Sequence, residues 1–382
     1  MDVKRILVVS STRPPATVFD LIDALREAGR EVRVVSDWAH PVVDSLAIGA
    51  FDVARWAERA GFRPDALLFV EGGTRRIFPC GMEDLDCVTA FYSLDPHLHL
   101  RQHLRLAKLF DVTFVAHLQF ISHFRDGEVH WLPAAIVDPR LRAPAKGARD
   151  IEVAHIGSEN RELHPERVRL LDLIRSRYRN TFIGRADLSK IGEIYGRAKV
   201  VFNHSVRAEV NIRYFEAMGA GAVLVTDRAP RETGVEQLFS PGEDFLEYHD
   251  DASMLSAIDS VLGDESKRES MGSRAQRHIL ANHTYRHRAE KILETLSAAE
   301  HRVRPGPADY LPAYHELRYP EAVMLEASRS LAGMKAQGDR NPVLALLVPV
   351  LSGLARMLGW AYRVRYRLRY ARLARKGSAR SR

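Results

Sequence analysis

Short apolar segments alternate with longer amphipathic ones along the first third of the chain. The segment 18–28 has apolar residues at helical spacing and ends at Gly29. Five apolar segments are predicted to be strands: 6–10, 31–36, 65–70, 88–93 and 112–116. Strands that are apolar on both faces and leave room for helices between them are typical of a parallel sheet covered by helices. This part of the chain is therefore predicted to be α/β.

A break rich in proline and small residues, 133–147, interrupts the alternation and is predicted to be an interdomain linker. The pattern then restarts. Strands are expected at 151–157, 181–184, 200–203 and 222–226, and helices at 165–178, 188–198 and from 213. Two successive halves of this kind predict two Rossmann-like domains that face a central cleft.

The chain length supports a division into domains. Its 382 residues, 46% of them hydrophobic, exceed what one compact core usually serves. We expect domain boundaries at 1–145, 146–304 and 305–382, the last being a helical extension that follows a proline-rich segment.

The positive charge of the chain is concentrated at its carboxyl end. Residues 356–382 contain ten Arg or Lys residues and no acidic residue. Because these ten positive charges exceed the net charge of +7, the rest of the chain is slightly acidic. A nucleic-acid enzyme would spread its positive charge along a groove, so no nucleic-acid partner is expected. The first apolar run is too short for a signal peptide, and Cys80 and Cys87 match no zinc or redox spacing, so we expect a cytoplasmic protein.

The segment 200–227 carries the densest signal for function. It reads VVFNHS, then EVNIRYFEAMGAG, then a strand that ends in Thr226-Asp227. This stretch resembles the group-one glycosyltransferases of the spore-maturation (CgeB-like) branch, in which Asn-x-Arg-x-Phe-Glu-Ala leads into a turn of small residues. The resemblance covers about residues 60–300. It implies the GT-B fold, with an acceptor-side first domain and a second domain that binds a nucleotide sugar.

Physical chemistry supports a donor site in this segment. Asn211 is a candidate donor contact, and the helix predicted from residue 213 offers N–H groups and a partial positive charge to a diphosphate. Arg213 would add a bidentate phosphate contact. The resemblance assigns Glu216 to the ribose hydroxyls, although it could also be a solvated helix residue. Gly219 could permit close backbone approach to the donor or form only a tight turn.

Other candidate donor contacts lie where predicted strands of the second half end. Ligands gather at the carboxyl ends of strands in open parallel sheets. The candidates are Gly157, Ser158, Gly184, Arg185, Asn203, His204 and Ser205. For Gly157, Gly184 and His204 a purely structural role stays open.

Catalytic candidates come from both halves. Asp95 follows a strand of the first half and could take a proton from an acceptor hydroxyl, as could His97; either could instead cap the next helix. Gly72 and Gly73 resemble acceptor-side loop residues of the family. Many retaining relatives carry two glutamates with seven residues between them. Glu209 and Glu216 enclose six, so the role of Glu209 and the stereochemical outcome stay open.

We expect neither a metal nor a cofactor, only the nucleotide-sugar substrate. No Asp-x-Asp pair is present, and His97, His99 and His103 are joined by no carboxylate or cysteine at a zinc spacing. The sequence thus predicts a metal-independent, hexosyltransferase-like enzyme with an unidentified acceptor. A nucleotide-sugar epimerase of the same fold and a non-catalytic nucleotide-sugar-binding protein are the alternatives.

The carboxyl-terminal tail combines an apolar stretch with interleaved Tyr and Arg. Residues 342–355 carry no charge, but the stretch is shorter than the ~20 residues that span a bilayer. Tyr and Arg alternate over 362–370, as expected at a lipid headgroup boundary. We expect peripheral attachment to the inner, anionic membrane face, which would suit a lipid-linked acceptor. A helix packed on the enzyme with a basic end is the alternative.

Overall fold

The computed structural model describes residues 2–12, 18–72, 77–137 and 149–306, with 309, 310 and 313. The chain forms two compact units. The first holds residues 1–116, 120–131 and those from Ile292 onward, and the second holds 117–119 and 132–291.

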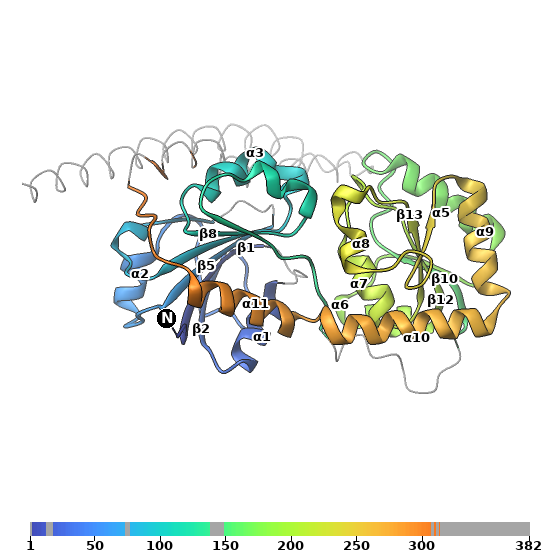
Figure 1. Cartoon of the computed structure of the whole chain (residues 1–382), viewed down its shortest axis with the longest axis horizontal. Coiled ribbons are helices and arrows are strands. Elements are labelled where there is room, and N and C mark those ends of the chain that lie inside the picture. The colour runs from blue at the N-terminus through green and yellow to red at the C-terminus, as the bar shows by residue number, and fades with distance from the viewer. Residues whose placement is uncertain are drawn as a thin grey trace, which may run out of the picture. The chain divides into compact units, whose positions relative to one another are not determined.

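A seven-stranded parallel sheet forms the first unit (Figure 1). Its order is β3-β2-β1-β5-β7-β8-β9, and Val8, Leu68 and Ala90 lie side by side in β1, β5 and β7. The strands are β1 (Arg5–Ser11), β2 (Glu31–Ser36), β3 (Ser45–Leu46), β5 (Ala66–Glu71), β7 (Val88–Ser93), β8 (Val112–Val115) and β9 (Glu128–Trp131). A separate parallel pair joins β4 (Gly49–Asp52) to β6 (Ile77–Cys80).

Helices α1 and α3 lie on opposite sides of this sheet in Figure 1. The core contains the rings of Phe69, Phe91 and Phe110, with centroids 5.7–5.9 Å apart. The helical segments of this part are α1 (Val18–Glu27), α2 (Val53–Arg59), α3 (Pro96–Ala107), η1 (Met82–Asp84) and η2 (Leu118–His123).

The second unit contains a five-stranded parallel sheet with the order β11-β10-β12-β13-β14. Its strands are β10 (Ile151–Ile156), β11 (Thr181–Gly184), β12 (Ala198–Asn203), β13 (Val223–Asp227) and β14 (Leu246–Tyr248). Its helices are α5 (Pro165–Arg177), α6 (Leu188–Arg197), α7 (Ile212–Gly219), η3 (Arg231–Thr233), α8 (Val235–Leu238), α9 (Asp251–Leu262) and α10 (Glu265–Asn282).

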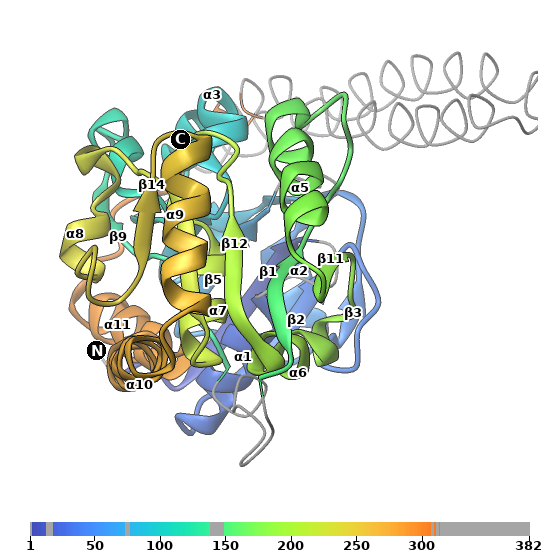
Figure 2. The same cartoon turned by 90° about the vertical axis from the view of Figure 1, so that its right-hand side faces the viewer.

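Different helices pack on the two faces of the second sheet. Apolar residues of α5 and α9 share one core with Val200 and Phe202 of β12, and Figure 2 shows both helices beside that strand. Side chains alternate along a strand, so Asn203 points to the other face, where it meets residues of α7. This alternation puts Phe202 in the core and Asn203 beside the start of α7.

The α/β class with two parallel sheets is confirmed. The apolar segments predicted as strands are β1, β2, β5, β7 and β8 in the first unit and β10 to β13 in the second. The short strands β3, β4, β6, β9 and β14 were not predicted.

Residues from Ile292 onward, which include the end of α11 (Tyr285–Ala298), belong to the first unit, and the predicted domain bounds stay a prediction. Asp111 holds residues 301–303 in this unit, because its carboxylate accepts from the backbone N–H of Arg302 at 2.7 Å and of Val303 at 2.6 Å, and lies 2.9 Å from His301 Nδ1. The predicted linker at 133–147 and the extension 305–382 lie largely outside the described residues.

In the part of the chain that the structure describes, none of the helices has the length and apolar character needed to cross a bilayer.

Candidate functional site

Three strand ends meet at one edge of the second sheet. Strand β12 lies between β10 and β13, so Ile156, Asn203 and Asp227 end neighbouring strands. The loop after β12 leads directly into α7, which therefore starts at this edge. In open parallel sheets this is the edge at which ligands bind.

Arg213, in the first turn of α7, is held against two of these strand ends. Its Nη1 donates to Asn203 Oδ1 at 2.5 Å and its Nη2 to the Ile156 carbonyl at 2.5 Å, while Nε donates to the Tyr195 hydroxyl at 3.3 Å. A guanidinium has five N–H groups. Within the described residues three of them have partners, which leaves two for a ligand.

Asn203 is a positioning residue in this arrangement. Its side chain is fully buried and donates from Nδ2 to Thr226 Oγ1 at 2.9 Å, while Oδ1 accepts from Arg213 and from Asn211 Nδ2. Asn211 also caps α7, because its Oδ1 accepts from the Arg213 backbone N–H at 3.1 Å. The sequence predicted Asn203 and Asn211 as donor contacts. The structure gives both a role in fixing Arg213.

Glu216 lies one turn after Arg213 on α7 and is half-buried. The charged groups of Arg213 and Glu216 both lie close to Tyr195, a fully buried residue of α6. The pKa of Tyr195 is raised to about 12, chiefly by burial; the Arg213 guanidinium opposes the rise and the Glu216 carboxylate contributes to it. Arg213 and Glu216 thus lie on the side of α7 that faces Tyr195, a neighbour that the sequence did not reveal, and their donor contacts stay a prediction.

Gly157, just after β10, makes room for Arg213. A Cβ atom there would lie 2.8 Å from His155 Nε2 and 2.9 Å from Arg213 Nη2, closer than real Cβ atoms come. Its N–H donates to the Gly184 carbonyl at 2.8 Å, so these two predicted glycines lie side by side. Ser158 is half-buried and Arg185 is exposed.

The loop between β12 and α7 contains a strained residue and is stabilised by hydrogen bonds to one of its own side chains. Ala208 has a φ of 53°, in the left-handed region that non-glycine residues rarely adopt. Glu209 is 3% exposed, and its carboxylate accepts from the backbone N–H of Val206 at 3.2 Å and of Arg207 at 2.6 Å. In this structure Glu209 therefore stabilises its own loop. Its predicted catalytic role stays a prediction.

Ser205 and His204 start this loop. Ser205 donates to the Asp227 carboxylate from its hydroxyl and, at 2.8 Å, from its backbone N–H. The His204 carbonyl accepts from Arg167 Nε at 3.0 Å and Nη2 at 2.7 Å. Burial and then the charge of Arg213 lower the pKa of Arg167, so a second guanidinium lies near the first.

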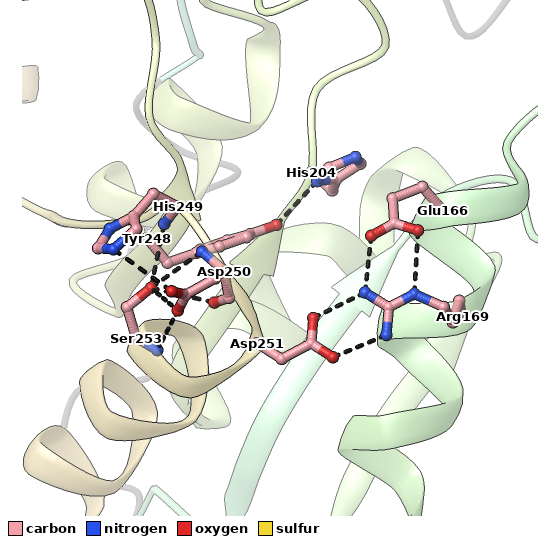
Figure 3. A network of polar contacts seen from close by, with 8 residues as sticks. All are labelled: Glu166, Arg169, His204, Tyr248, His249, Asp250, Asp251 and Ser253. Atoms are coloured by element: carbon pink, nitrogen blue, oxygen red, sulfur yellow. Dashed lines mark hydrogen bonds and ion pairs between the residues drawn. The ribbon is translucent and has the colours of Figure 1, made fainter.

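A polar network joins α5 and α9 beside His204 (Figure 3). Arg169 donates to both carboxylate oxygens of Glu166, at 2.7 and 2.9 Å, and to both of Asp251, at 2.7 Å each. His204 itself bonds to Tyr248, whose hydroxyl oxygen lies 2.9 Å from His204 Nδ1. These contacts fix the side of the strand edge that α5 and α9 cover.

Gly219 lies at the opposite end of α7 from Arg213. Its carbonyl accepts from Gln276 Nε2 of α10 at 2.9 Å. Gly272 of α10 packs so closely on the next turn that a Cβ there would lie 2.3 Å from the Gly221 carbonyl oxygen. The structure therefore supports the turn interpretation of Gly219 and gives no support to a donor contact, because the helix separates this end from the strand edge.

The first-unit candidates lie after strands, as predicted. Asp95 takes the N-cap position of α3 but its side chain makes no capping hydrogen bond, and His97 is half-buried in the first turn. A buried pair that the sequence did not reveal, Ser93 Oγ and His103 Nδ1, lies nearby at 2.6 Å. A Cβ atom on Gly72 would lie 2.9 Å from Thr12 Cγ2. Gly73 lies outside the described residues.

No group of three His, Cys, Asp or Glu side chains suited to a metal ion occurs among the described residues. Four residues that contribute to the site in the second unit were not predicted from the sequence: Tyr195, His155, Arg167 and Tyr248. Only His155 gave a signal, since it is an imidazole inside an apolar strand.

Comparison with known proteins agrees with this geometry. Residues 140–294, somewhat less than half of the chain, match the family described as glycosyl transferase-like. No curated protein sequence matches the chain.

Solved glycosyltransferase structures share the fold. A sucrose-phosphate synthase from Thermosynechococcus elongatus has a TM-score of 0.58 at 14% identity, covering 76% of this chain and 98% of its own. HepE from Anabaena, in complex with UDP and glucose, has a TM-score of 0.57 at 13% identity, with 77% and 100% covered. A glycosyltransferase from Rickettsia africae has 0.56 at 9% identity, with 77% and 98% covered. Residues 140–294 are therefore similar to the glycosyl transferase-like family, and the chain has the GT-B fold of these solved glycosyltransferase structures.

Proposed function

We propose that this protein transfers a sugar from a nucleoside diphosphate sugar to an acceptor, with the donor bound by the second unit. The observation that carries the proposal is Arg213, fixed at the ends of β10 and β12 with two N–H groups left for a ligand. A planar guanidinium at a helix N-terminus suits a diphosphate. The HepE structures with UDP and with UDP-glucose share the fold, which supports a nucleotide-sugar donor.

The roles of the residues follow from the charge that develops during transfer. As the bond between the anomeric carbon and the diphosphate oxygen breaks, Arg213 and the start of α7 stabilise the negative charge on the leaving group. Glu216 accepts hydrogen bonds from the ribose hydroxyls. The acceptor oxygen forms the new bond to the anomeric carbon, and Asp95 or His97 of the first unit takes its proton. In this proposal the cationic side chain replaces a metal ion, and no cofactor takes part.

A donor screen tests the proposal. Thermal unfolding is followed with UDP-, ADP- and GDP-sugars and with the free nucleoside diphosphates. A ligand at 100 times its Kd adds about 2.7 kcal/mol to the free energy of unfolding, so a true donor raises Tm measurably. Absence of any shift with the whole panel would contradict the proposal.

Measuring conversion of the donor distinguishes the two alternative functions from sugar transfer. An epimerase would convert the donor without an acceptor, and a binding protein would shift Tm without converting it. The family match and the shared fold give no support to the epimerase. The closer resemblance to the CgeB-like branch is part of our proposal and rests on the Asn211-to-Ala217 segment.

The acceptor and the location of the protein are proposed from the sequence of the tail alone. An uncharged stretch followed by ten basic residues favours attachment to an anionic membrane surface on the cytoplasmic side. A lipid-linked or membrane-proximal acceptor would then lie within reach.

A further inference from the structure

Tyr248 holds the imidazole of His204 in one tautomer. The Tyr248 hydroxyl donates its single proton to the Asn203 carbonyl at 3.2 Å, since a carbonyl oxygen can only accept. The same hydroxyl oxygen lies 2.9 Å from His204 Nδ1. Because the hydroxyl proton is already used, Nδ1 must supply the hydrogen of that bond. In the neutral ring the second nitrogen, Nε2, therefore carries a lone pair and no proton.

Both the ring and the backbone of His204 are fixed. The imidazole stacks on Tyr248 with centroids 6.3 Å apart and planes 21° apart. Two hydrogen bonds from Arg167 hold the His204 carbonyl. Figure 3 shows the second ring nitrogen pointing away from Tyr248. His204 is partly exposed, and its Nε2 makes no hydrogen bond to any residue that the structure describes.

The charged groups nearest to this ring already bind one another. Arg169 binds both oxygens of Glu166 and also Asp251, and Glu166 interacts with His204 electrostatically, while neither carboxylate has a hydrogen bond to Nε2. Burial raises the pKa of Tyr248, so its hydroxyl stays protonated and the tautomer persists. The Nε2 atom is thus an oriented hydrogen-bond acceptor at the end of β12, the strand whose Asn203 positions Arg213.

We propose that His204 Nε2 accepts a hydrogen bond from a hydroxyl of the bound nucleotide sugar, and that Tyr248 is the positioning residue that makes Nε2 an acceptor. This inference rests on the proposed function. A lone pair repels phosphate oxygens, which have no proton to donate at neutral pH. The contact is therefore with the ribose or the transferred sugar and not with the diphosphate.

His204→Asn tests the contact. The amide NH₂ of Asn takes over the bond from Nδ1 to Tyr248 but places nothing at Nε2. Calorimetric affinities are measured for UDP, ADP and GDP and for their glucose conjugates. We expect about fivefold to tenfold weaker binding, the effect of one neutral hydrogen bond. A loss for the nucleotide sugar alone assigns the transferred sugar, and an equal loss for the diphosphate assigns the ribose.

His249→Asn is the matched control, because His249 is exposed on the neighbouring turn. This variant should bind all the ligands as the unchanged protein does. If the unchanged protein binds none of these probes, the proposed function fails and takes this inference with it. If it binds them and His204→Asn binds equally well, this inference alone is wrong.

Tyr248→Phe tests the positioning role. The substitution keeps the ring stack but removes the hydroxyl, so the ¹⁵N spectrum of the His204 ring should change from the Nδ1–H form to a mixture of tautomers. Nucleotide-sugar affinity should fall by a smaller factor than in His204→Asn. A spectrum that keeps the single Nδ1–H form would overturn the role of Tyr248, and thermal unfolding of each variant verifies that it is folded.

Discussion

Arg213 Nη1 lies 2.5 Å from Asn203 Oδ1, and Asn203 is fully buried at the end of β12. The orientation of the guanidinium is thus set by the sheet as well as by the helix that carries it. Asn203 is in turn held by Thr226 of the neighbouring strand, so one chain of hydrogen bonds joins β13, β12 and α7.

Asn203→Ala should weaken both binding and folding. It removes the partner of Arg213 Nη1 and the donor to Thr226 Oγ1, two hydrogen bonds of a fully buried side chain, which costs about 1–3 kcal/mol of the free energy of unfolding. We expect nucleotide affinity to fall about tenfold, as measured by calorimetry beside chemical denaturation. Thr226→Ser keeps the hydroxyl that accepts from Asn203 and should behave like the unchanged protein. Unaltered affinity of Asn203→Ala would show that Arg213 does not need this support.

Gly157→Ala should displace Arg213. The new Cβ would lie 2.9 Å from Arg213 Nη2 and 2.8 Å from His155 Nε2, so the guanidinium and the imidazole must shift, which disturbs the bond from Nη2 to the Ile156 carbonyl. We expect at least about tenfold weaker nucleotide binding, or ~1.4 kcal/mol. Gly306→Ala is the control, because its nearest neighbour would be a side-chain oxygen of Asp309 at 3.8 Å. Binding that is equal in the two variants contradicts the steric argument.

Asp111 gives the attachment of residues 301–303 a pH dependence. Burial raises the pKa of this carboxyl, but hydrogen bonds from Val303, His301, Thr89 and Arg302 outweigh it, so the net pKa lies below its usual value. A lowered pKa stabilises the folded state above the unfolded value of about 3.9, and this contribution is lost as the pH falls through the folded value.

Asp111→Asn should therefore lower Tm most at neutral pH. The carboxylate stabilises by roughly 1–3 kcal/mol through its buried hydrogen bonds. Thermal unfolding of both proteins is compared between pH 7 and pH 3, and the difference in Tm should shrink below about pH 4. A difference that is constant over this range would argue against a charged Asp111 in the folded protein.

Truncation after Gly338 should release the protein from anionic vesicles. The removed residues include the ten basic ones of 356–382, each worth about 1 kcal/mol near an anionic surface. Sedimentation with vesicles that contain phosphatidylserine should pellet the full chain and leave the truncated one in solution. Equal sedimentation of the two proteins refutes the membrane role, and vesicles of neutral lipid serve as the control.

The strands that carry the site could be predicted from sequence because they are buried on both faces. β10 (IEVAHI) and β12 (AKVVFN) are mostly apolar; Gly157 follows the first and Asn203 ends the second. β9 (EVHW) and β14 (LEY) mix polar and apolar residues at sheet edges, so their existence depends on pairing with β8 and β13. Such pairing is a tertiary effect that no local pattern contains.

The site was predictable in its ligand-facing charge and not in its supports. Arg213 stood out because a short motif placed it at a helix start beside a strand end. Tyr195 reaches Arg213 only because α6 packs beside α7, and Glu209 turns toward its own loop because two backbone N–H groups are free there to bind it. Both facts depend on three-dimensional packing and loop geometry, which residue spacing does not determine.

The most direct test of the account is the affinity of Arg213→Lys for the nucleoside diphosphate that performs best in the donor screen, measured by calorimetry. Lysine keeps the charge but cannot hold Ile156, Asn203 and Tyr195 while presenting two further N–H groups. We predict at least about tenfold weaker binding, with no change for Arg197→Lys, whose side chain is exposed at the end of α6. Equal affinity of Arg213→Lys and the unchanged protein would contradict the central claim that Arg213 grips the donor diphosphate.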